Sequence, residues 1–278
     1  MNILLTGGSG DLGTWLTPHL LSLGHRVSVI DLIQPGAIDV HYYPGSILDP
    51  ATLRAAMAGA DIVIHIAAWH GIHAGIKSEA EFHDLNIVGT ENIVRCWTEG
   101  LFENLLFISS SSVLNADSYY GETKRQAEAH ISHTAQKHQL KAISLRPRGF
   151  IPSSNRAVYD SFQSWAQYFY TGGVHIDDVG QAVLLALKAL PSSTAGNHPC
   201  FMVDRYPDFK PDELATWDLK GPGTTFAANF PDQVELARQN GLPIHTQPLS
   251  YSIADTQKQL AYNPRYGIQE LLQDLQDQ

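Results

Sequence analysis

The fold is decided at the start of the chain, where residues 2–13 read NILLTGGSGDLG. The apolar run Asn2–Thr6 is typical of a strand that is buried on both faces. A glycine-rich turn follows it, and the turn leads into Leu12–Leu23, which has the spacing of a helix. This order of strand, glycine turn and helix predicts the first unit of an α/β domain.

The glycine turn predicts a phosphate site. A helix N-terminus has unpaired N–H groups and a partial positive charge, so it attracts phosphate. Small residues let the backbone turn tightly and approach a pyrophosphate, and here they are Gly7, Gly10 and Gly13. A glycine pattern alone is weak evidence, but its position between a strand and a helix makes the prediction much stronger.

A carboxylate ends the second predicted strand, at Asp31 of Arg26–Asp31. In a dinucleotide-binding unit, an acid at this position accepts hydrogen bonds from the adenosine ribose and repels a 2′-phosphate. We therefore expect NAD rather than NADP as the cofactor. The alternative is that Asp31 only caps a turn.

Strand-like and helix-like segments alternate through the first two-thirds of the chain. The expected strands are Asn2–Thr6, Arg26–Asp31, His41–Tyr43, Asp61–Ala67, Asn104–Ser109 and Lys141–Arg146. The expected helices are Leu12–Leu23, Ala51–Ala58, Glu79–Glu99 and Tyr120–His138. This alternation predicts a doubly wound parallel sheet of the Rossmann type.

The domain organisation follows from a change in composition near residue 148. We expect residues 1–148 to form the NAD-binding domain, with 174–203 returning to it. Residues 149–173 and 204–278 are expected to form a small C-terminal substrate-binding cap. The aromatic residues between 159 and 170 are predicted to form the core of that cap rather than a binding platform.

Composition excludes several classes of protein. The 278 residues are 44% hydrophobic and 17% charged, with a net charge of −10, an ordinary balance for a globular protein. No basic cluster indicates a nucleic-acid partner, and no apolar run approaches the ~18 residues of a membrane span. The two cysteines favour reduced thiols in the cytoplasm, and the N-terminus is interpreted as a strand rather than a signal peptide.

Three residues form a candidate catalytic group. Tyr120 and Lys124 are four residues apart near the start of a predicted helix, so they share one face. A free tyrosine titrates near ~10, and we expect the lysine ammonium to lower that pKa so that Tyr120 can exchange a proton. Ser110 follows a strand at the edge where ligands bind, and its hydroxyl can hold a substrate oxygen.

Together these patterns resemble the extended short-chain dehydrogenase/reductase superfamily, of the NAD-dependent epimerase/dehydratase kind. The matching motifs are Thr6–Gly13, Asp31, His65–Ala68, Asn86–Thr90, Ser109–Ser111, Tyr120–Lys124, Leu145–Pro147 and His175–Val179. The resemblance implies that the cofactor meets the backbone of Asp11 and Leu12, and that it lies near Ser46, Ile47, Ala67, Ala68 and Asn86. It implies catalytic roles for Ser110, Tyr120 and Lys124, and a homodimer formed by Glu79–Glu99 and Tyr120–His138.

The chain departs from the family pattern in three ways. Ser46 stands where members usually carry Asp, and Ser111-Ser112 stands where dehydratases carry Asp-Glu, which argues against dehydration. The chain is also short, with Ser110 and Tyr120 only ten positions apart, whereas members that bind nucleotide sugars usually have larger caps. We therefore expect a compact substrate such as a sugar, a sugar acid, or a small polyol or ketone.

We expect four residues to contact the substrate: Trp69, His70, Ser111 and Arg156. Residues 152–156 resemble the substrate loop of uronate dehydrogenases, in which Arg156 would hold a carboxylate; the alternative is an exposed loop arginine. His70 and His73 are expected to line the crevice near the nicotinamide, and no metal site is predicted because two ligands are too few.

Three functions remain open at this point. The first is an oxidoreductase that interconverts an alcohol and a carbonyl with NAD as a dissociable cosubstrate. The second is a sugar epimerase that uses the same residues while NAD stays bound. The third, an NAD-binding sensor without turnover, predicts an incomplete catalytic group, whereas this chain carries all three residues.

Overall fold

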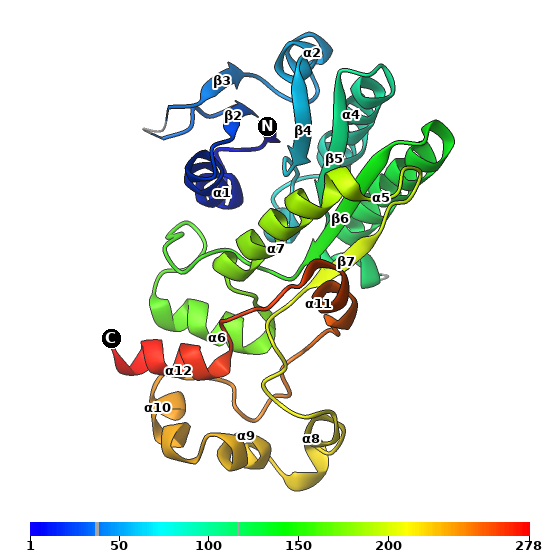
Figure 1. Ribbon diagram of the computed structural model, residues 1–278. Coiled ribbons are helices and arrows are strands. Elements are labelled where there is room, and N and C mark those ends of the chain that lie inside the picture. The colour runs from blue at the N-terminus through cyan, green and yellow to red at the C-terminus, as the bar shows by residue number, and fades with distance from the viewer. Residues whose placement is uncertain (37–38, 116) are drawn as a thin grey trace. The chain divides into compact units, whose positions relative to one another are not determined.

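The computed structural model describes residues 1–36, 39–115 and 117–278 (Figure 1). The chain forms two compact units. The first consists of Met1–Pro147 and Ala182–Met202, and the second of Arg148–Gln181 and Val203–Gln278. Among the described residues, no helix is both long and apolar enough to span a membrane.

A seven-stranded sheet has the strand order β3-β2-β1-β4-β5-β6-β7. The strands are β1 (Asn2–Thr6), β2 (Arg26–Asp31), β3 (His41–Pro44), β4 (Ala60–His65), β5 (Phe102–Ile108), β6 (Lys141–Pro147) and β7 (Cys200–Val203). All neighbouring pairs from β3 to β6 are parallel. The order reverses at β1, which is the feature of a doubly wound sheet, so the predicted fold class is confirmed.

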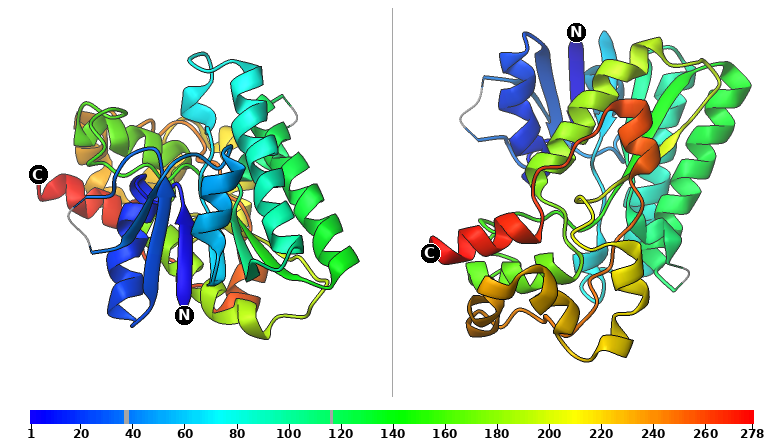
Figure 2. Two further views of the ribbon diagram at one scale, coloured as in Figure 1. Left: turned by 90° about the horizontal axis from the view of Figure 1, so that it is seen from above. Right: turned by 60° about the horizontal axis from the view of Figure 1, so that its bottom comes forward.

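Helices cover both faces of this sheet (Figure 2). The first unit contains α1 (Asp11–Ser22), α2 (Pro50–Met57), α3 (Glu79–His83), α4 (Gly89–Thr98) and α5 (Tyr119–His138). Helices α2, α4 and α5 share one face, and α1 lies on the other. The helix expected over Glu79–Glu99 is present as α3, a π-helical turn, η2 (Asp84–Val88), and α4, which follow one another without a break.

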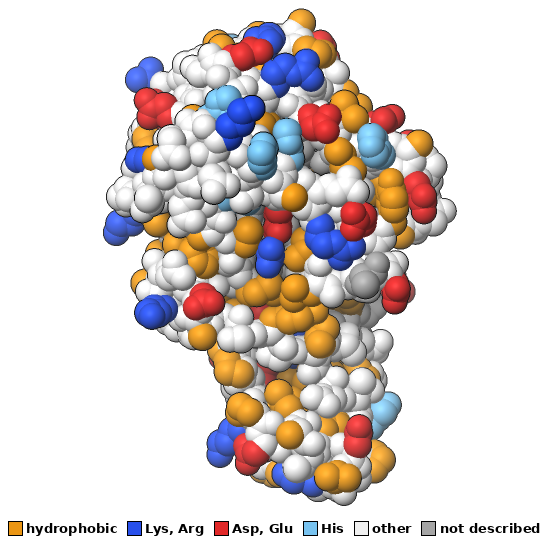
Figure 3. Space-filling view, turned by 90° about the vertical axis from the view of Figure 1, so that its right-hand side faces the viewer, with side chains coloured by type: hydrophobic (Ala, Val, Ile, Leu, Met, Phe, Trp, Pro, Cys, Tyr) orange, Lys and Arg blue, Asp and Glu red, His pale blue; other side chains and the backbone are white. Residues whose placement is uncertain are grey.

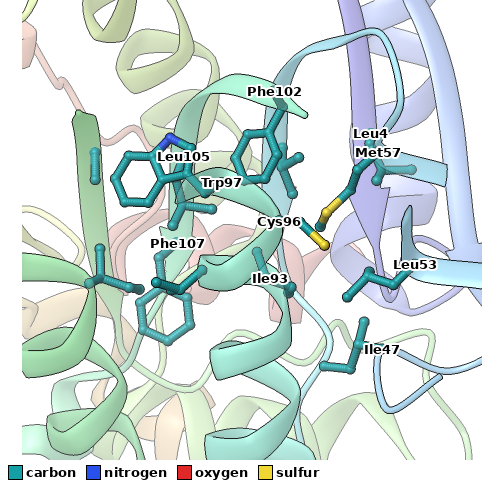
Figure 4. Close-up of a cluster of buried hydrophobic side chains, with 14 of the residues drawn as sticks. Leu4, Ile47, Leu53, Met57, Ile93, Cys96, Trp97, Phe102, Leu105 and Phe107 are labelled. Carbon is teal, nitrogen blue, oxygen red and sulfur yellow. The ribbon is translucent and has the colours of Figure 1, made fainter. Parts of the chain in front are cut away.

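The core between the sheet and α2, α4 and α5 is built from large apolar side chains (Figure 4). Trp97 and Phe102 stack with their ring centroids 6.2 Å apart, and Leu105 and Phe107 continue the cluster along β5. Because strands β1, β4 and β5 are buried on both faces, they are apolar without alternation. This rigid base fixes the carboxyl ends of the strands, where the candidate site lies.

The second unit is mostly helical. Its elements are α6 (Phe162–Gly172), the first turns of α7 (Ile176–Ala189), α8 (Pro211–Ala215), α9 (Thr224–Asn229), α10 (Val234–Gln239), α11 (Ala254–Leu260) and α12 (Ile268–Gln276). Trp165, Phe169 and Tyr170 are buried in its core. The prediction that these aromatic residues form a core is therefore confirmed, whereas substrate binding by this unit stays a prediction.

Candidate active site

The glycine turn is packed too tightly for most side chains. A Cβ on Gly13 would lie 2.3 Å from the carbonyl oxygen of Gly8, and one on Gly7 would lie 2.8 Å from the backbone of Ala67. Gly7 also has a φ of +69°, which favours glycine. The turn therefore needs these glycines to bring β1, β4 and α1 together.

Gly10 differs from its neighbours because it leaves space. A Cβ there would meet only the carbonyl oxygen of Gly7, at 3.5 Å. Gly10 is the N-cap of α1, so no side-chain cap covers the helix N-terminus. Asp11 and Leu12 form the first turn of that helix, and the Leu12 side chain is buried. The turn and the helix N-terminus thus have the form of a cradle for a diphosphate.

Asp31 ends β2 beside this turn. One carboxylate oxygen accepts a hydrogen bond from the Ser9 N–H at 3.0 Å, and the other accepts from the Ile33 N–H at 3.1 Å. The carboxylate therefore caps a local turn and also ties the glycine turn to β2. It remains partly exposed at the edge where a ribose would lie.

Ser46 and Ile47 follow β3. The Ser46 hydroxyl accepts a hydrogen bond from the Leu48 N–H at 3.1 Å. The Ile47 side chain is buried against Gly89, where a Cβ would lie 2.5 Å from its Cδ1. Ile47 is therefore a core residue, and its carbonyl oxygen accepts a hydrogen bond from Asn92 Nδ2 at 3.1 Å.

A buried histidine at the end of β4 was not assigned a role from the sequence. His65 lies in register with Thr6 of β1, and its Nδ1 is 2.8 Å from the Thr6 hydroxyl. Its Nε2 is 3.0 Å from the hydroxyl of Thr90, which donates to the Asn86 carbonyl oxygen at 2.7 Å. Burial, reinforced by the charge of Lys124, holds the pKa of His65 well below its usual range.

These contacts assign the protons of the network. Because Thr90 donates to Asn86, it must accept the Nε2–H of His65, and Nδ1 then accepts from Thr6. The Thr6 oxygen also lies 3.3 Å from the Ala67 N–H, which donates to it. The neutral imidazole thus joins the ends of β1 and β4 to the π-helical turn. A threonine and a histidine at the ends of two adjacent predicted strands were the signal for this network.

Asn86 joins the loop after β4 to the helix with the candidate catalytic residues. Its Oδ1 accepts from the Trp69 N–H at 2.8 Å, and its Nδ2 donates to the Trp69 carbonyl oxygen at 2.9 Å. The same Nδ2 is 3.0 Å from the hydroxyl of Thr123 on α5. Asn86 therefore positions the segment of Ala67 and Ala68. It was expected near the dinucleotide, and its side-chain hydrogen bonds are made to protein groups.

Ser110, Tyr120 and Lys124 lie together at the carboxyl end of β5. The Lys124 ammonium donates to the carbonyl oxygen of Ile108 at 2.8 Å and lies 6.0 Å from the centroid of the Tyr120 ring. The Ser110 side chain acts to lower the pKa of the Tyr120 phenol. Ser110 is the N-cap of the short 3₁₀ turn Ser111–Leu114, and its hydroxyl accepts from the Ser112 N–H at 3.1 Å.

The electrostatics of this group correct one expectation. Burial raises the pKa of Tyr120 to about 12, and the Ser110 side chain opposes that rise. The predicted lowering by Lys124 was therefore wrong for this structure. Burial also lowers the pKa of Lys124 to about 7, with Glu128 acting in the opposite direction.

The loop after β4 approaches the Tyr120 ring. A Cβ on Gly71 would lie 3.8 Å from Tyr120 Cδ1. Burial, with smaller effects from His73 and Lys124, lowers the pKa of His70 to about 4, so His70 is neutral. The rings of His70 and His73 are 4.4 Å apart, and Trp69 lies against His73. The expected neighbourhood of Trp69, His70 and the catalytic group is therefore present in the first unit.

The remaining predicted contact residues lie in different units. Ser111 begins the 3₁₀ turn after Ser110 and is partly exposed. Arg156 is exposed on a turn of the second unit. Across residues 1–36, 39–115 and 117–278, no group of three or more His, Cys, Asp or Glu side chains could hold a metal ion.

A doubly wound sheet with a glycine cradle and a Ser–Tyr–Lys group at its carboxyl edge defines the short-chain dehydrogenase/reductase class. The chain belongs to the NAD dependent epimerase/dehydratase family, whose model matches residues 3–154. It is therefore an NAD-dependent enzyme, and the glycine cradle and the open position at Gly10 fit NAD.

Relatives within the family have different activities. The chain is 26% identical to a 4-hydroxy-2-methyl-3-oxo-4-farnesyl-3,4-dihydroquinoline-1-oxide ketoreductase from Stigmatella aurantiaca, over 74% of this chain and 69% of the relative. It is 28% identical to a UDP-glucose 4-epimerase from Halalkalibacterium halodurans, over 52% of this chain and half of the relative's length. A reductase and an epimerase are thus both similar to this chain.

Solved structures share the fold. The UDP-glucuronic acid 4-epimerase from Bacillus cereus, solved with UDP-glucuronic acid and NAD, has a TM-score of 0.72 and 18% identity to this chain. The similarity covers 100% of this chain and 98% of that structure. At this identity the similarity is one of architecture, and it extends through both units.

Proposed function

We propose that this protein transfers a hydride between NAD and a C–OH carbon of a small sugar-like or sugar-acid substrate, with Tyr120, Lys124 and Ser110 as its catalytic residues. The observation that carries the proposal is the buried Lys124 ammonium, which lies 6.0 Å from the centroid of the Tyr120 ring at the carboxyl end of the strand that leads to Ser110. Bound NAD supplies the hydride acceptor. Ser110 holds the substrate oxygen, and Tyr120 exchanges its proton.

Cofactor binding is assigned to the cradle and the strand ends around it. The backbone of Gly7, Gly10, Asp11, Leu12 and Gly13 holds the diphosphate, and Asp31 holds the ribose. Ser46, Ile47, Ala67, Ala68 and Asn86 complete the dinucleotide site, with Asn86 acting through the loop that it clamps. Trp69, His70, Ser111 and Arg156 are assigned to the substrate.

An epimerase that uses the same residues is the second candidate, and the similarity to a UDP-glucose 4-epimerase supports it. In an epimerase the hydride returns to the same substrate carbon, so NAD stays bound and no net NADH forms. The absorbance of the purified protein distinguishes the two. Firmly held NAD with no NADH accumulation during turnover selects the epimerase.

The test of the proposal is a screen of sugars, uronates and hydroxy acids with NADH absorbance as the readout, repeated with Tyr120→Phe. This variant should lose turnover by roughly 10²- to 10⁴-fold while still binding NAD. Tyr119→Phe is the matched control, because it removes the same hydroxyl one residue away and should keep its activity. Equal turnover by Tyr120→Phe and the wild type would refute the assignment.

We also propose a cytoplasmic homodimer formed through α4 and α5. The outer face of these helices has a hollow of about 350 Å³, lined by Val94, Arg95, Thr134 and Lys137 among others, and by His130, His133 and His138. Histidines lie among acidic and basic side chains on this side of the first unit (Figure 3). Sedimentation of the purified protein tests the proposal, and a monomer at micromolar concentration would overturn it.

A further inference from the structure

A buried carboxylate, that of Glu128, lies on the same helix face as Lys124 and is not part of the Ser110–Tyr120–Lys124 group. Glu128 follows Lys124 by four residues on α5, so one helical turn separates them on that face. Lys124 is 3% exposed and Glu128 is 7% exposed. Charged side chains are rarely buried to this degree without a partner.

The partner of Glu128 is Arg146 on β6. Arg146 Nε donates to one carboxylate oxygen at 2.8 Å, and Nη2 donates to the other at 2.6 Å. Such a bidentate pair fixes the position and the plane of the carboxylate. Glu128 therefore presents a fixed negative charge one turn from the Lys124 ammonium.

The other titratable groups around these residues are neutral at neutral pH. On β7 and the segment before it, burial raises the pKa of Cys200 to about 11 and lowers that of His198 to about 4. His65 and His70 face Lys124, and burial depresses both of their pKa values. The Tyr120 phenol is also neutral, because burial raises its pKa to about 12. Among the titratable groups of the described residues, Glu128 is the one that favours the charged form of Lys124.

We propose that Glu128, held in place by Arg146, is a positioning residue that keeps Lys124 charged in its buried site, so that the ammonium is available to Tyr120. This inference rests on the proposed function. The physical reason is that burial disfavours an ammonium unless an opposite charge compensates it. The competing explanation is that the pair only ties α5 to β6, in which case its loss would change stability and not the protonation of Lys124.

The test is an NMR titration of the ¹⁵N-labelled lysine ammonium groups in the full chain with NAD bound. The Lys124 signal is assigned by its loss in Lys124→Met. Glu128→Gln should lower the pKa of Lys124 by about one pH unit or more, whereas Glu128→Asp, which retains the charge, should restore part of the difference. An unchanged pKa in Glu128→Gln would overturn the inference.

The matched control is Glu122→Gln. It removes one carboxylate from the same helix, but Glu122 is partly exposed and pairs with Arg125 at 2.5 Å. The pKa of Lys124 should be unchanged in this variant. If it falls as far as in Glu128→Gln, the effect is one of total charge, and the specific role of Glu128 is refuted.

Glu128→Gln leaves Arg146 without its partner, which can impair folding. A second variant keeps the test decisive in that case. Glu128→Gln combined with Arg146→Gln removes both charges and keeps two side chains that can hydrogen-bond to each other. The pKa of Lys124 should still fall, because the compensating carboxylate is absent. A pKa equal to that of the wild type in the folded double variant would contradict the inference.

This titration separates failure of the inference from failure of the proposed function. It needs no substrate, so a lowered Lys124 pKa in a protein without hydride transfer would refute the function and leave the coupling standing. An unchanged Lys124 pKa in an active enzyme would refute the coupling and leave the proposed function standing. In the active enzyme, the alkaline limit of kcat should move to lower pH in Glu128→Gln and stay in place in Glu122→Gln.

Discussion

Each of the two units of this protein buries a cation, but the two cations have different numbers of hydrogen-bond and ion-pair partners. In the second unit, Arg205 is 2% exposed and bonds to the Asp208 carboxylate at 2.8 Å and to the carbonyl oxygens of Phe169 and Tyr170 at 2.6 and 3.0 Å. In the described part of the first unit, Lys124 is as deeply buried but makes one hydrogen bond, to the Ile108 carbonyl oxygen.

This difference separates a structural charge from a functional one. A fully paired buried cation holds elements together, and its removal leaves an uncompensated partner. A buried cation with few partners is costly to retain and has a shifted pKa, which is the pattern of functional sites. The pKa of Lys124, lowered to about 7, fits the second description.

The largest expected effect is on stability, in Arg205→Met. This change leaves the buried Asp208 carboxylate without its partner, so the free energy of unfolding should fall by about 3–5 kcal/mol. Urea denaturation measures the loss. Arg156→Met is the control, because Arg156 is exposed on the same unit and should change stability by no more than about 0.5 kcal/mol. Equal stability of the two variants would contradict the structural role of Arg205.

Lys124→Met should show the opposite pattern. Turnover should fall by roughly 10²- to 10⁴-fold, since the charge beside Tyr120 is lost, while the free energy of unfolding stays the same or rises because a desolvated charge is removed. Lys188→Met, an exposed position of the first unit, is the control for both measurements. A large loss of stability in Lys124→Met would show that Lys124 is structural.

The stability of the wild type should depend on pH through Lys124. Its pKa is lowered from 10.5 to about 7 on folding, so between these values the unfolded chain binds more protons than the folded one. Stability relative to Lys124→Met should therefore rise with pH in this range, by up to about 1.4 kcal/mol per pH unit. Urea titrations of both proteins from pH 7 to 9 measure it. A difference that is flat or falls with pH would contradict the lowered pKa.

Substitutions at two glycines of the cradle should distinguish a role in packing from a role in cofactor binding. Gly13→Ala places a Cβ 2.3 Å from the Gly8 carbonyl oxygen and should destabilise the protein by about 1–3 kcal/mol. Gly10→Ala has space within the protein, so it should keep its stability and lose NAD affinity. Thermal unfolding and NAD titration give the two readouts. Full NAD affinity in Gly10→Ala would remove Gly10 from the site.

Local sequence patterns predicted much of the first unit. The expected bounds of β1 and β2 agree with the structure, because a short apolar run next to a glycine turn leaves little choice of where the strand begins and ends. The Ser110–Tyr120–Lys124 neighbourhood was also predicted, since strand ends and helix faces follow simple periodicities. The helix expected over Glu79–Glu99 is present as an unbroken helical run, but the π-helical turn within it was not predicted, because Asn86 in that turn bonds to Trp69 and Thr123 from distant segments.

Long-range electrostatics could not be predicted in the same way. The pKa of Tyr120 depends on how deeply the phenol is enclosed, and spacing along a helix contains no information on enclosure. The pair of Glu128 with Arg146 and the buried Arg205 likewise join segments that are distant in sequence. The roles of the site residues in binding and catalysis stay predictions until they are measured.

The central claim is that the Tyr120 phenol becomes an acid–base group beside Lys124 when NAD is bound. The most direct measurement is the ultraviolet absorbance of tyrosinate in the NAD complex, titrated with pH in the wild type and in Tyr120→Phe. The difference between them should show one tyrosine that ionises below the value of about 12 that burial gives Tyr120 without the cofactor. A difference that shows no ionisation until the pH approaches 12 would contradict the claim.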